Sequence, residues 1–127
     1  MENKKILIAD DENNIVQIIA TKLRNNGFDI ITADNGEDGY KLCCEEQPDL
    51  IVTDLEMPGM TGIELAEKIH RKSEFSDVPI ILLATKDSEL KNSRMEKAGI
   101  AGRLNKPFSP KELLACVENM LTNSAIK

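Results

Sequence analysis

The sequence predicts an α/β fold in which five parallel strands form one sheet with helices on both of its faces. Short apolar runs alternate with segments of helical periodicity along the 127 residues. Several runs, such as residues 80–84, are continuously apolar, as expected for strands that a parallel sheet buries on both faces. Three predicted strands end in or next to a charged residue, at Asp10, Asp54 and Lys106. Right-handed crossovers would place helices on both faces of the sheet.

The first half of the chain gives three strand patterns and two helix patterns. Asp11-Glu12-Asn13 can cap the first helix, and Gly27 suits the left-handed position at its end. The second strand pattern is the most polar, which favours a place near a sheet edge. Gln47-Pro48 closes the second helix, because a residue before proline disfavours helical backbone angles. In order, we predict a strand at 5–9, a helix up to about 24, a strand at 28–33, a helix at about 37–46 and a strand at 50–54.

The second half opens two of its helices with capping boxes, Thr61-Gly62-Ile63-Glu64 and Ser109-Pro110-Lys111-Glu112. The helix pattern between them has only Leu90, Met95 and Ala98 as apolar residues, so this helix should be loosely held and mostly exposed. In order, we predict a helix at 61–72, a strand at 80–84, a helix at 88–98, a strand at 101–105 and a helix at 109–121.

Composition limits the size, compartment and function classes. A chain of 127 residues suits one domain, expected at residues 1–122 with a tail or linker start at 123–127. The net charge of −6, with acids and bases interspersed, argues against nonspecific nucleic-acid binding. No apolar run suits a membrane span or a signal peptide. The three cysteines match no metal spacing, so reduced thiols in a cytoplasmic protein are expected, and the lone His70 should be exposed on a helix.

The carboxyl ends of the predicted strands carry the candidate site. In open α/β sheets, ligands bind at these ends. The topology therefore gathers Asp10, Asp11, Asp54, Ala84-Thr85 and Lys106. Three converging carboxylates repel one another, and a hard cation with oxygen ligands, such as Mg²⁺, relieves that repulsion.

These residues also predict the chemistry of the site. Asp11 and Asp54 are candidate direct Mg²⁺ ligands, Asp10 could act through water, and the backbone carbonyl of Glu56 could supply another oxygen. The ammonium of Lys106 can pair with a phosphoryl oxygen. A carboxylate beside Mg²⁺ and lysine can attack an activated phosphate and form an acyl phosphate. Because the chain has no glycine-rich phosphate loop, we expect no tight ATP binding. The chain would transfer the group onto itself and turn over no external substrate.

With these residues the chain resembles, over almost its full length, the receiver domain of two-component response regulators. The resemblance implies a flavodoxin-like fold with strand order 2-1-3-4-5 and a cis peptide before Pro107. It implies Mg²⁺ at Asp10, Asp11 and Asp54, and phosphoryl transfer to Asp54 from the phosphohistidine of a sensor histidine kinase or phosphotransfer protein. The matching motifs are Asp10-Asp11, Asp54 with Met57-Pro58-Gly59 and Gly62, Ala98-Gly99, and Lys106-Pro107-Phe108.

The resemblance also implies an output surface, made by helix 88–98, strand 101–105 and helix 109–121. Phosphorylation would change this face and so control a downstream protein or a fused output domain. Two copies of the chain could pair through the same face. No direct contact with nucleic acid or membrane is expected.

Two positions depart from the family pattern. The family usually has Ser or Thr at the end of the fourth strand, whereas ungapped counting puts Ala84 there and Thr85 one residue later. A slip of one residue turns a side chain to the opposite face, so Thr85 is not an automatic substitute. Arg103 stands where the family often has Tyr or Phe, and arginine cannot bury itself inward in the same way. We hypothesise that phosphorylation therefore couples weakly or differently to the output face.

Glu56 and Lys86 flank the predicted site and could tune the lifetime of the phosphorylated state. In the family these places affect access of the hydrolytic water. An acid and a base there could pair across the mouth of the site and slow dephosphorylation, or remain two solvated side chains.

Two other functions stay open at this point. A pseudo-receiver would use the same fold for protein interaction without productive phosphorylation. Ala84 and Arg103 are its best support, while the intact acids and Lys106 argue against it. A small Mg²⁺-dependent phosphatase would use an aspartate nucleophile, with Glu56 as general acid. The chain offers no cap domain for a substrate pocket, which counts against the phosphatase.

Overall fold

The chain alternates strands and helices throughout. The structure is a computed structural model that describes residues 3–85 and 92–126, with only the backbone of residue 92 and of residues 123–126. The elements are β1 (Lys5–Ala9), α1 (Asn13–Arg24), β2 (Asp29–Ala33), α2 (Gly36–Glu46), β3 (Leu50–Asp54), α3 (Gly62–His70), η1 (Ser73–Phe75), β4 (Ile80–Thr85), α4 (Asn92–Ala98), β5 (Ile100–Lys106) and α5 (Pro110–Ile126).

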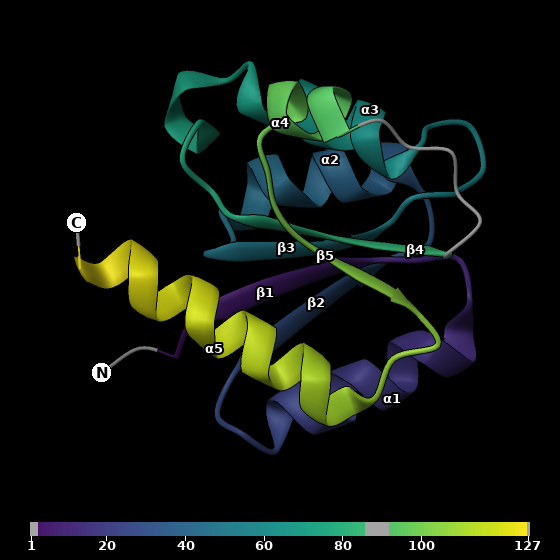
Figure 1. Cartoon of the computed structure of the whole chain (residues 1–127), viewed down its shortest axis with the longest axis vertical. Coiled ribbons are helices and arrows are strands. Elements are labelled where there is room, and N and C mark those ends of the chain that lie inside the picture. The colour runs from purple at the N-terminus through teal and green to yellow at the C-terminus, as the bar shows by residue number, and fades with distance from the viewer. Residues whose placement is uncertain (1–2, 86–91, 127) are drawn as a thin grey trace.

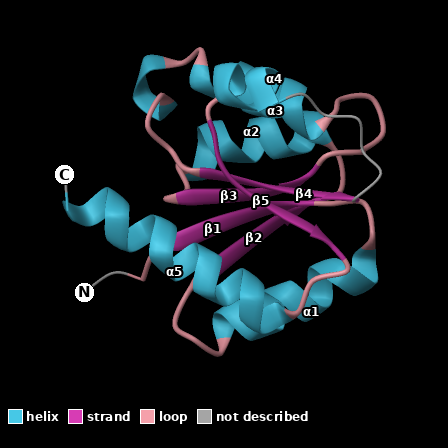
Figure 2. Ribbon diagram, viewed as in Figure 1, coloured by secondary structure: helices cyan, strands magenta, loops and turns pink. Residues whose placement is uncertain are grey.

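The strands form one parallel sheet between two helical layers. Their order is β2-β1-β3-β4-β5, which confirms the predicted fold class and strand order. α1 and α5 cover one face, and α2, α3 and α4 cover the other (Figure 1). Figure 2 shows the strands as a layer between the helices. All carboxyl ends of the strands therefore meet along one edge of the sheet.

The core consists of two clusters, one on each face of the sheet. Leu7 and Ala9 contribute to the cluster under α2 and α3, while Ile6 and Ile8 contribute to the cluster under α1 and α5. β1, β3 and β4 lie in the middle of the sheet, which explains why they are apolar on both faces and almost fully buried. β2 and β5 lie at the edges and are partly exposed, which confirms the edge place predicted for the second strand.

Local sequence signals set several of the boundaries. Thr61 and Glu64 form the predicted capping box: the Glu64 N–H donates to Thr61 Oγ1 at 3.1 Å and the Thr61 N–H donates to Glu64 Oε1 at 2.9 Å. Ser109 and Glu112 exchange the same pair of bonds at the start of α5. The Lys106-Pro107 peptide is cis, as the resemblance implies.

Other boundaries differ from the prediction. Glu12 is the N-cap residue of α1, yet its side chain makes no capping hydrogen bond. The predicted loop before β4 contains the short helix η1. α5 runs to Ile126, so residues 123–126 continue the last helix. Of the predicted helix 88–98, residues 88–91 lie outside the described residues.

His70 is not the exposed residue that the sequence predicts. It is half-buried at the end of α3, with Nδ1 2.7 Å from the Ala98 carbonyl oxygen and Nε2 2.9 Å from the Val78 carbonyl oxygen. The imidazole thereby joins the end of α3 to the end of α4 and to the segment before β4. Gly99 has a φ of 77°, and a Cβ there would collide with the ring. Both contacts are non-local, so no helical pattern around position 70 signals them.

Candidate functional site

The predicted acidic residues lie together at the carboxyl ends of β1 and β3. Asp10 directly follows β1 and is 1% exposed, and Asp54 ends β3 and is 6% exposed. With the exposed Asp11 and Glu12 they form a cluster in which one carboxylate oxygen of each residue lies within 4.8 Å of the others. The order β2-β1-β3 makes this the switch point of the sheet, where open α/β folds bind their ligands.

Lys106 extends from the end of β5 into this cluster. Its Nζ lies 2.9 Å from Glu12 Oε1. The same nitrogen lies 3.3 Å from Asp54 Oδ1 and 3.7 Å from Asp10 Oδ2. The Lys106 side chain is only 16% exposed, so most of it lies inside the site. The site thus places one cation among several carboxylates.

Burial and the negative charge of neighbouring carboxylates raise the pKa of the two buried acids, Asp10 and Asp54. Burial raises the pKa of Asp54 to about 6, and the charge of Asp10 adds to the rise, while Lys106 opposes it. Burial also raises the pKa of Asp10, against the hydrogen bond from the Glu12 N–H and the charge of Lys106. For Lys106, burial lowers the pKa, but the hydrogen bond to Glu12 and the charges of Asp10 and Asp54 outweigh it, so the pKa is raised.

The donor set of the cluster fits a divalent metal ion. Asp10 Oδ2 is buried and has no hydrogen-bond partner, while Oδ1 accepts from the Glu12 N–H at 2.9 Å. Four carboxylates face one ammonium here, which leaves an excess of negative charge. Oxygen ligands with net negative charge suit a hard cation. The cluster could therefore hold a metal ion.

A cavity of about 410 Å³ opens in front of Asp54. Ala84 and Thr85 both line it, but Ala84 is 2% exposed and Thr85 is exposed, as neighbours on a strand face opposite ways. Glu56 is exposed at the same cavity, and its predicted partner Lys86 lies outside the described residues. The lining residues are Asp11, Glu12, Asp54, Leu55, Glu56, Met57, Pro58, Ala84, Thr85 and Lys106.

Arg103 is tied to the end of β4. Its Nη2 donates to the Thr85 carbonyl oxygen at 3.0 Å, and its Nε donates to Asn105 Oδ1 at 2.9 Å. Thr85 is also the strand partner of Lys106. The guanidinium therefore links β5 to the segment of β4 that borders the cavity.

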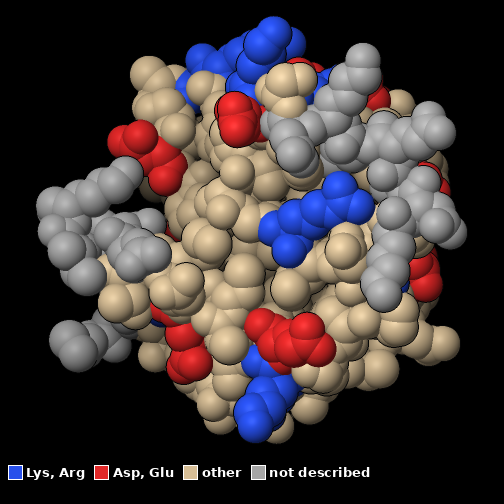
Figure 3. All heavy atoms as spheres, in the orientation of Figure 1, with Lys and Arg blue, Asp and Glu red and all other residues tan. Residues whose placement is uncertain are grey.

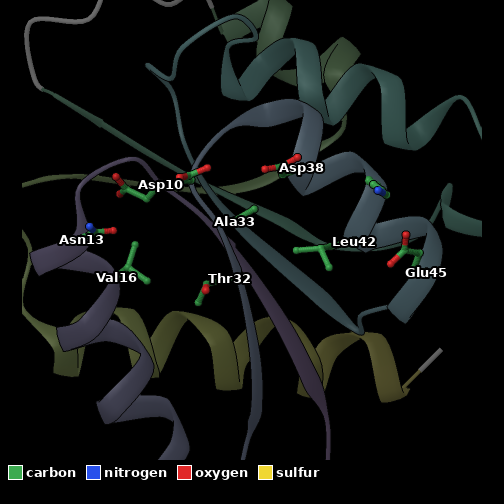
Figure 4. A pocket seen from close by; sticks show the side chains of 10 residues that line it. Asp10, Asn13, Val16, Thr32, Ala33, Asp38, Leu42 and Glu45 are labelled. Atoms are coloured by element: carbon green, nitrogen blue, oxygen red, sulfur yellow. The ribbon is translucent and has the colours of Figure 1, made fainter.

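A second cavity of about 500 Å³ lies next to Asp10. Figure 4 shows Asp10 and side chains from α1, β2 and α2 arranged around this cavity. The negative charge around Asp10 therefore extends beyond the cluster. The lining residues are Asp10, Asn13, Val16, Thr32, Ala33, Asp34, Asp38, Lys41, Leu42 and Glu45.

Sequence reasoning assigned Glu12 to helix capping and missed its place in the site. One signal could have revealed it. Glutamate is not among the residues that favour the N-cap position, whereas Ser, Thr, Asp and Asn are. A third acid directly after Asp10 and Asp11 at a strand end is therefore better explained by the site than by the helix.

The surface carries both signs of charge. Figure 3 shows acidic and basic groups on the viewed face, some of them adjacent and others separated by uncharged surface. Across residues 3–85 and 92–126, no helix combines the length and the apolar character needed to cross a bilayer.

Fold and site define a flavodoxin-like domain with an acidic site at its switch point that could hold a metal ion. The chain belongs to the response regulator receiver domain family, whose sequence profile matches residues 6–118. It is 39% identical to the alkaline phosphatase synthesis transcriptional regulatory protein PhoP of Bacillus subtilis, over 98% of this chain and 51% of that protein. It is 37% identical to the phosphate regulon transcriptional regulatory protein PhoB of Pseudomonas aeruginosa, over 95% and 53%.

The chain thus spans about half the length of these two relatives. Two solved structures match along nearly their whole length. The chemotaxis response regulator CheY4 of Vibrio cholerae has a TM-score of 0.87 and 30% identity, over 93% of this chain and 98% of that one. The receiver domain of the Francisella response regulator 1452 has a TM-score of 0.86 and 34% identity, over 96% and 99%. This domain family acts in two-component signalling.

Proposed function

We propose that Asp54 accepts a phosphoryl group and that this event changes the output face of the domain. The observation that carries the proposal is the position of Asp54. A buried carboxylate ends a central strand, 3.3 Å from the Lys106 ammonium, within an acidic cluster and open to a cavity. On the described residues, nothing favours a pseudo-receiver over a phosphorylated one.

The proposed reaction is an in-line phosphoryl transfer. One oxygen of Asp54 forms a bond to phosphorus while the phosphorus–nitrogen bond of a donor phosphohistidine breaks. The bonding pair stays on the donor imidazole, which takes up a proton. The ammonium of Lys106 lies close enough to Asp54 to pair with the transferred group and offset its charge. No external substrate is consumed, so the domain is an acceptor rather than a turnover enzyme.

Mg²⁺ is the proposed cofactor. Asp10, Asp11 and Asp54, with the backbone carbonyl of Glu56, would hold it. When bound, it neutralises negative charge on the carboxylates and the phosphoryl oxygens. The buried Oδ2 of Asp10, which accepts no hydrogen bond, and the excess of carboxylates over the one ammonium support this assignment, since both leave negative charge that Lys106 alone does not compensate.

The proposed donor is a sensor histidine kinase or a phosphotransfer protein in the cytoplasm. The proposed output face consists of α4, β5 and α5. It would contact a downstream protein or a fused output domain, or a second copy of the chain. The mixed surface charge supports protein partners over direct nucleic-acid contact.

We also propose that the response is transmitted differently from the usual pattern. Ala84 offers no hydroxyl to a phosphoryl oxygen, and Arg103 occupies the place of the aromatic switch. The bond from Arg103 to the Thr85 carbonyl supports a different link between β4 and β5. Glu56, exposed at the cavity, could pair with Lys86 and slow loss of the phosphoryl group. A phosphorylated wild type that decays faster than Glu56→Ala would argue against such shielding.

Phosphorylation by a small donor tests the proposed function. The wild type is incubated with acetyl phosphate and Mg²⁺, and its intact mass is measured. We expect the mass to increase by one phosphoryl group only when Mg²⁺ is present, and Asp54→Asn to remain unmodified. A wild type that takes up no phosphoryl group from acetyl phosphate or from any cognate kinase would refute the proposal.

A further inference from the structure

Glu12 occupies the N-cap of α1 without capping it. Its side chain makes no hydrogen bond to the first turn of the helix. The N-cap residues of the next two helices behave differently, because Asn35 accepts from the Asp38 N–H and Thr61 accepts from the Glu64 N–H. Short polar side chains suit this task, and glutamate is one methylene longer than aspartate. The position is therefore used for another purpose.

The carboxylate of Glu12 instead binds Lys106, which lies 94 residues away in the sequence. At 2.9 Å, Glu12 is the nearest of the three described carboxylates around Nζ. The Glu12 side chain is 55% exposed, whereas that of Asp54 is 8% exposed. Lys106 thus lies between an acid at the rim of the site and an acid inside it.

The backbone of Glu12 holds a second group of the site. Its N–H donates to Asp10 Oδ1 at 2.9 Å. One residue therefore orients an inner carboxylate through its backbone and the lysine through its side chain. Since the backbone bond does not depend on the side chain, a substitution can remove one contact and keep the other.

We propose that Glu12 is a positioning residue for phosphoryl transfer, which holds Lys106 toward the rim in the unphosphorylated domain and yields it to the phosphoryl group afterwards. The inference rests on the proposed function of Asp54. Before transfer, the Lys106 ammonium interacts with both Glu12 and Asp54. The Asp54 oxygen that must attack phosphorus is therefore less strongly paired with the ammonium than it would be without Glu12. After transfer, a phosphoryl group with three acceptor oxygens and about two negative charges competes better for the ammonium than one exposed carboxylate does.

Replacing the Glu12 carboxylate should strengthen binding of a phosphoryl mimic. Glu12→Gln keeps the size and the backbone contact to Asp10 but removes the competing charge. We expect beryllofluoride to bind Glu12→Gln about fivefold more tightly than the wild type in saturating Mg²⁺, the equivalent of one exposed ion pair. Glu45→Gln is the matched control, because Glu45 is an exposed glutamate that lines the neighbouring cavity beside Asp10 and makes no ion pair with Lys106 among the described residues.

A structural readout separates positioning from a general charge effect. In the unphosphorylated protein, Glu12→Gln should change the ¹⁵N chemical shift of the Lys106 ammonium, and Glu45→Gln should not. In the beryllofluoride complex the Glu12→Gln shift difference should vanish, because the two side chains no longer meet. The affinity gain should also be lost in a Lys106→Met background.

The outcomes distinguish this inference from the function on which it rests. Equal affinity gains for Glu12→Gln and Glu45→Gln, or a gain that survives in Lys106→Met, would overturn the role of Glu12 and leave Asp54 as acceptor. A Lys106 signal that responds equally to Glu12→Gln with and without beryllofluoride would overturn it as well. A wild type that binds no beryllofluoride in Mg²⁺ and takes up no phosphoryl group would instead remove the proposed function itself.

Discussion

Asp54→Asn should stabilise the metal-free protein at neutral pH, although it removes the proposed acceptor. Asp54 is 6% exposed, and its pKa rises from the ordinary 3.8 to about 6, chiefly through burial. A rise of that size corresponds to about 3 kcal/mol of folding free energy lost when the carboxylate is ionised. Asparagine has the same shape and carries no charge. We therefore expect the free energy of unfolding at pH 7 to rise by up to about 3 kcal/mol.

The pH dependence follows from the direction of the pKa shift. The pKa of Asp54 is higher in the folded state than in the unfolded state, so folding takes up a proton between about pH 4 and pH 6. The stability of the wild type relative to Asp54→Asn should therefore fall as the pH rises through this window and stay low above it. Below about pH 4 the two proteins should be equally stable, because Asp54 is protonated in both states.

Urea unfolding in EDTA, followed by far-ultraviolet circular dichroism, measures this difference, since the chain has no tryptophan. Asp29→Asn, at an exposed position on β2, is the control and should change stability by less than about 0.5 kcal/mol. Added Mg²⁺ should stabilise the wild type more than Asp54→Asn and so narrow the gap. An Asp54→Asn variant that is no more stable than the wild type at pH 7 would contradict this prediction. A difference in the free energy of unfolding that persists at pH 4 would contradict it as well.

Further substitutions test the missing hydroxyl at Ala84, the contacts of His70 and the close packing of Gly62. Ala84→Thr should restore a hydroxyl and tighten beryllofluoride binding in Mg²⁺ by at least about tenfold. If Ala84→Thr leaves the affinity unchanged and Thr85→Ala abolishes the conformational response, Thr85 is the residue that senses the phosphoryl group. His70→Leu should lower the free energy of unfolding by about 1 to 3 kcal/mol in urea titrations, because the imidazole N–H donates to one of the two neighbouring carbonyl oxygens and that carbonyl loses its donor. An unchanged urea midpoint would contradict this role of His70. Gly62→Ala should lower the free energy of unfolding by about 1 to 3 kcal/mol in the same urea titrations and weaken Mg²⁺ binding, because a Cβ there would collide with the Asp54 carbonyl. A variant with the stability and Mg²⁺ affinity of the wild type would contradict this prediction.

The fold and the place of the acidic site follow from short-range patterns. Apolar runs in an alternating α/β order predict a parallel sheet, and a parallel sheet brings its carboxyl ends together. That rule alone places Asp10, Asp54 and Lys106 near one another, and the structure finds both acids within 3.7 Å of the lysine nitrogen. The capping boxes of α3 and α5 could also be predicted, because each is a short-range pattern between two residues that are three apart in the sequence.

Side-chain partners that are distant in the sequence could not be predicted in this way. Glu12 meets a lysine 94 residues away, and His70 meets a carbonyl 28 residues away. Helical periodicity says which face a residue lies on, but not which loop or strand end packs against that face. The bond from Arg103 to the Thr85 carbonyl belongs to the same category, because it depends on how two neighbouring strands end.

Mapping the modified residue tests the central claim most directly. The wild type is treated with acetyl phosphate and Mg²⁺, reduced with borohydride to convert any acyl phosphate to homoserine, digested and sequenced by tandem mass spectrometry. We predict homoserine at position 54 and at no other acidic position. Modification at Asp10 or Asp11 with an unmodified Asp54, or equal modification of an Asp54→Asn variant, would contradict the assignment of Asp54 as phosphoryl acceptor.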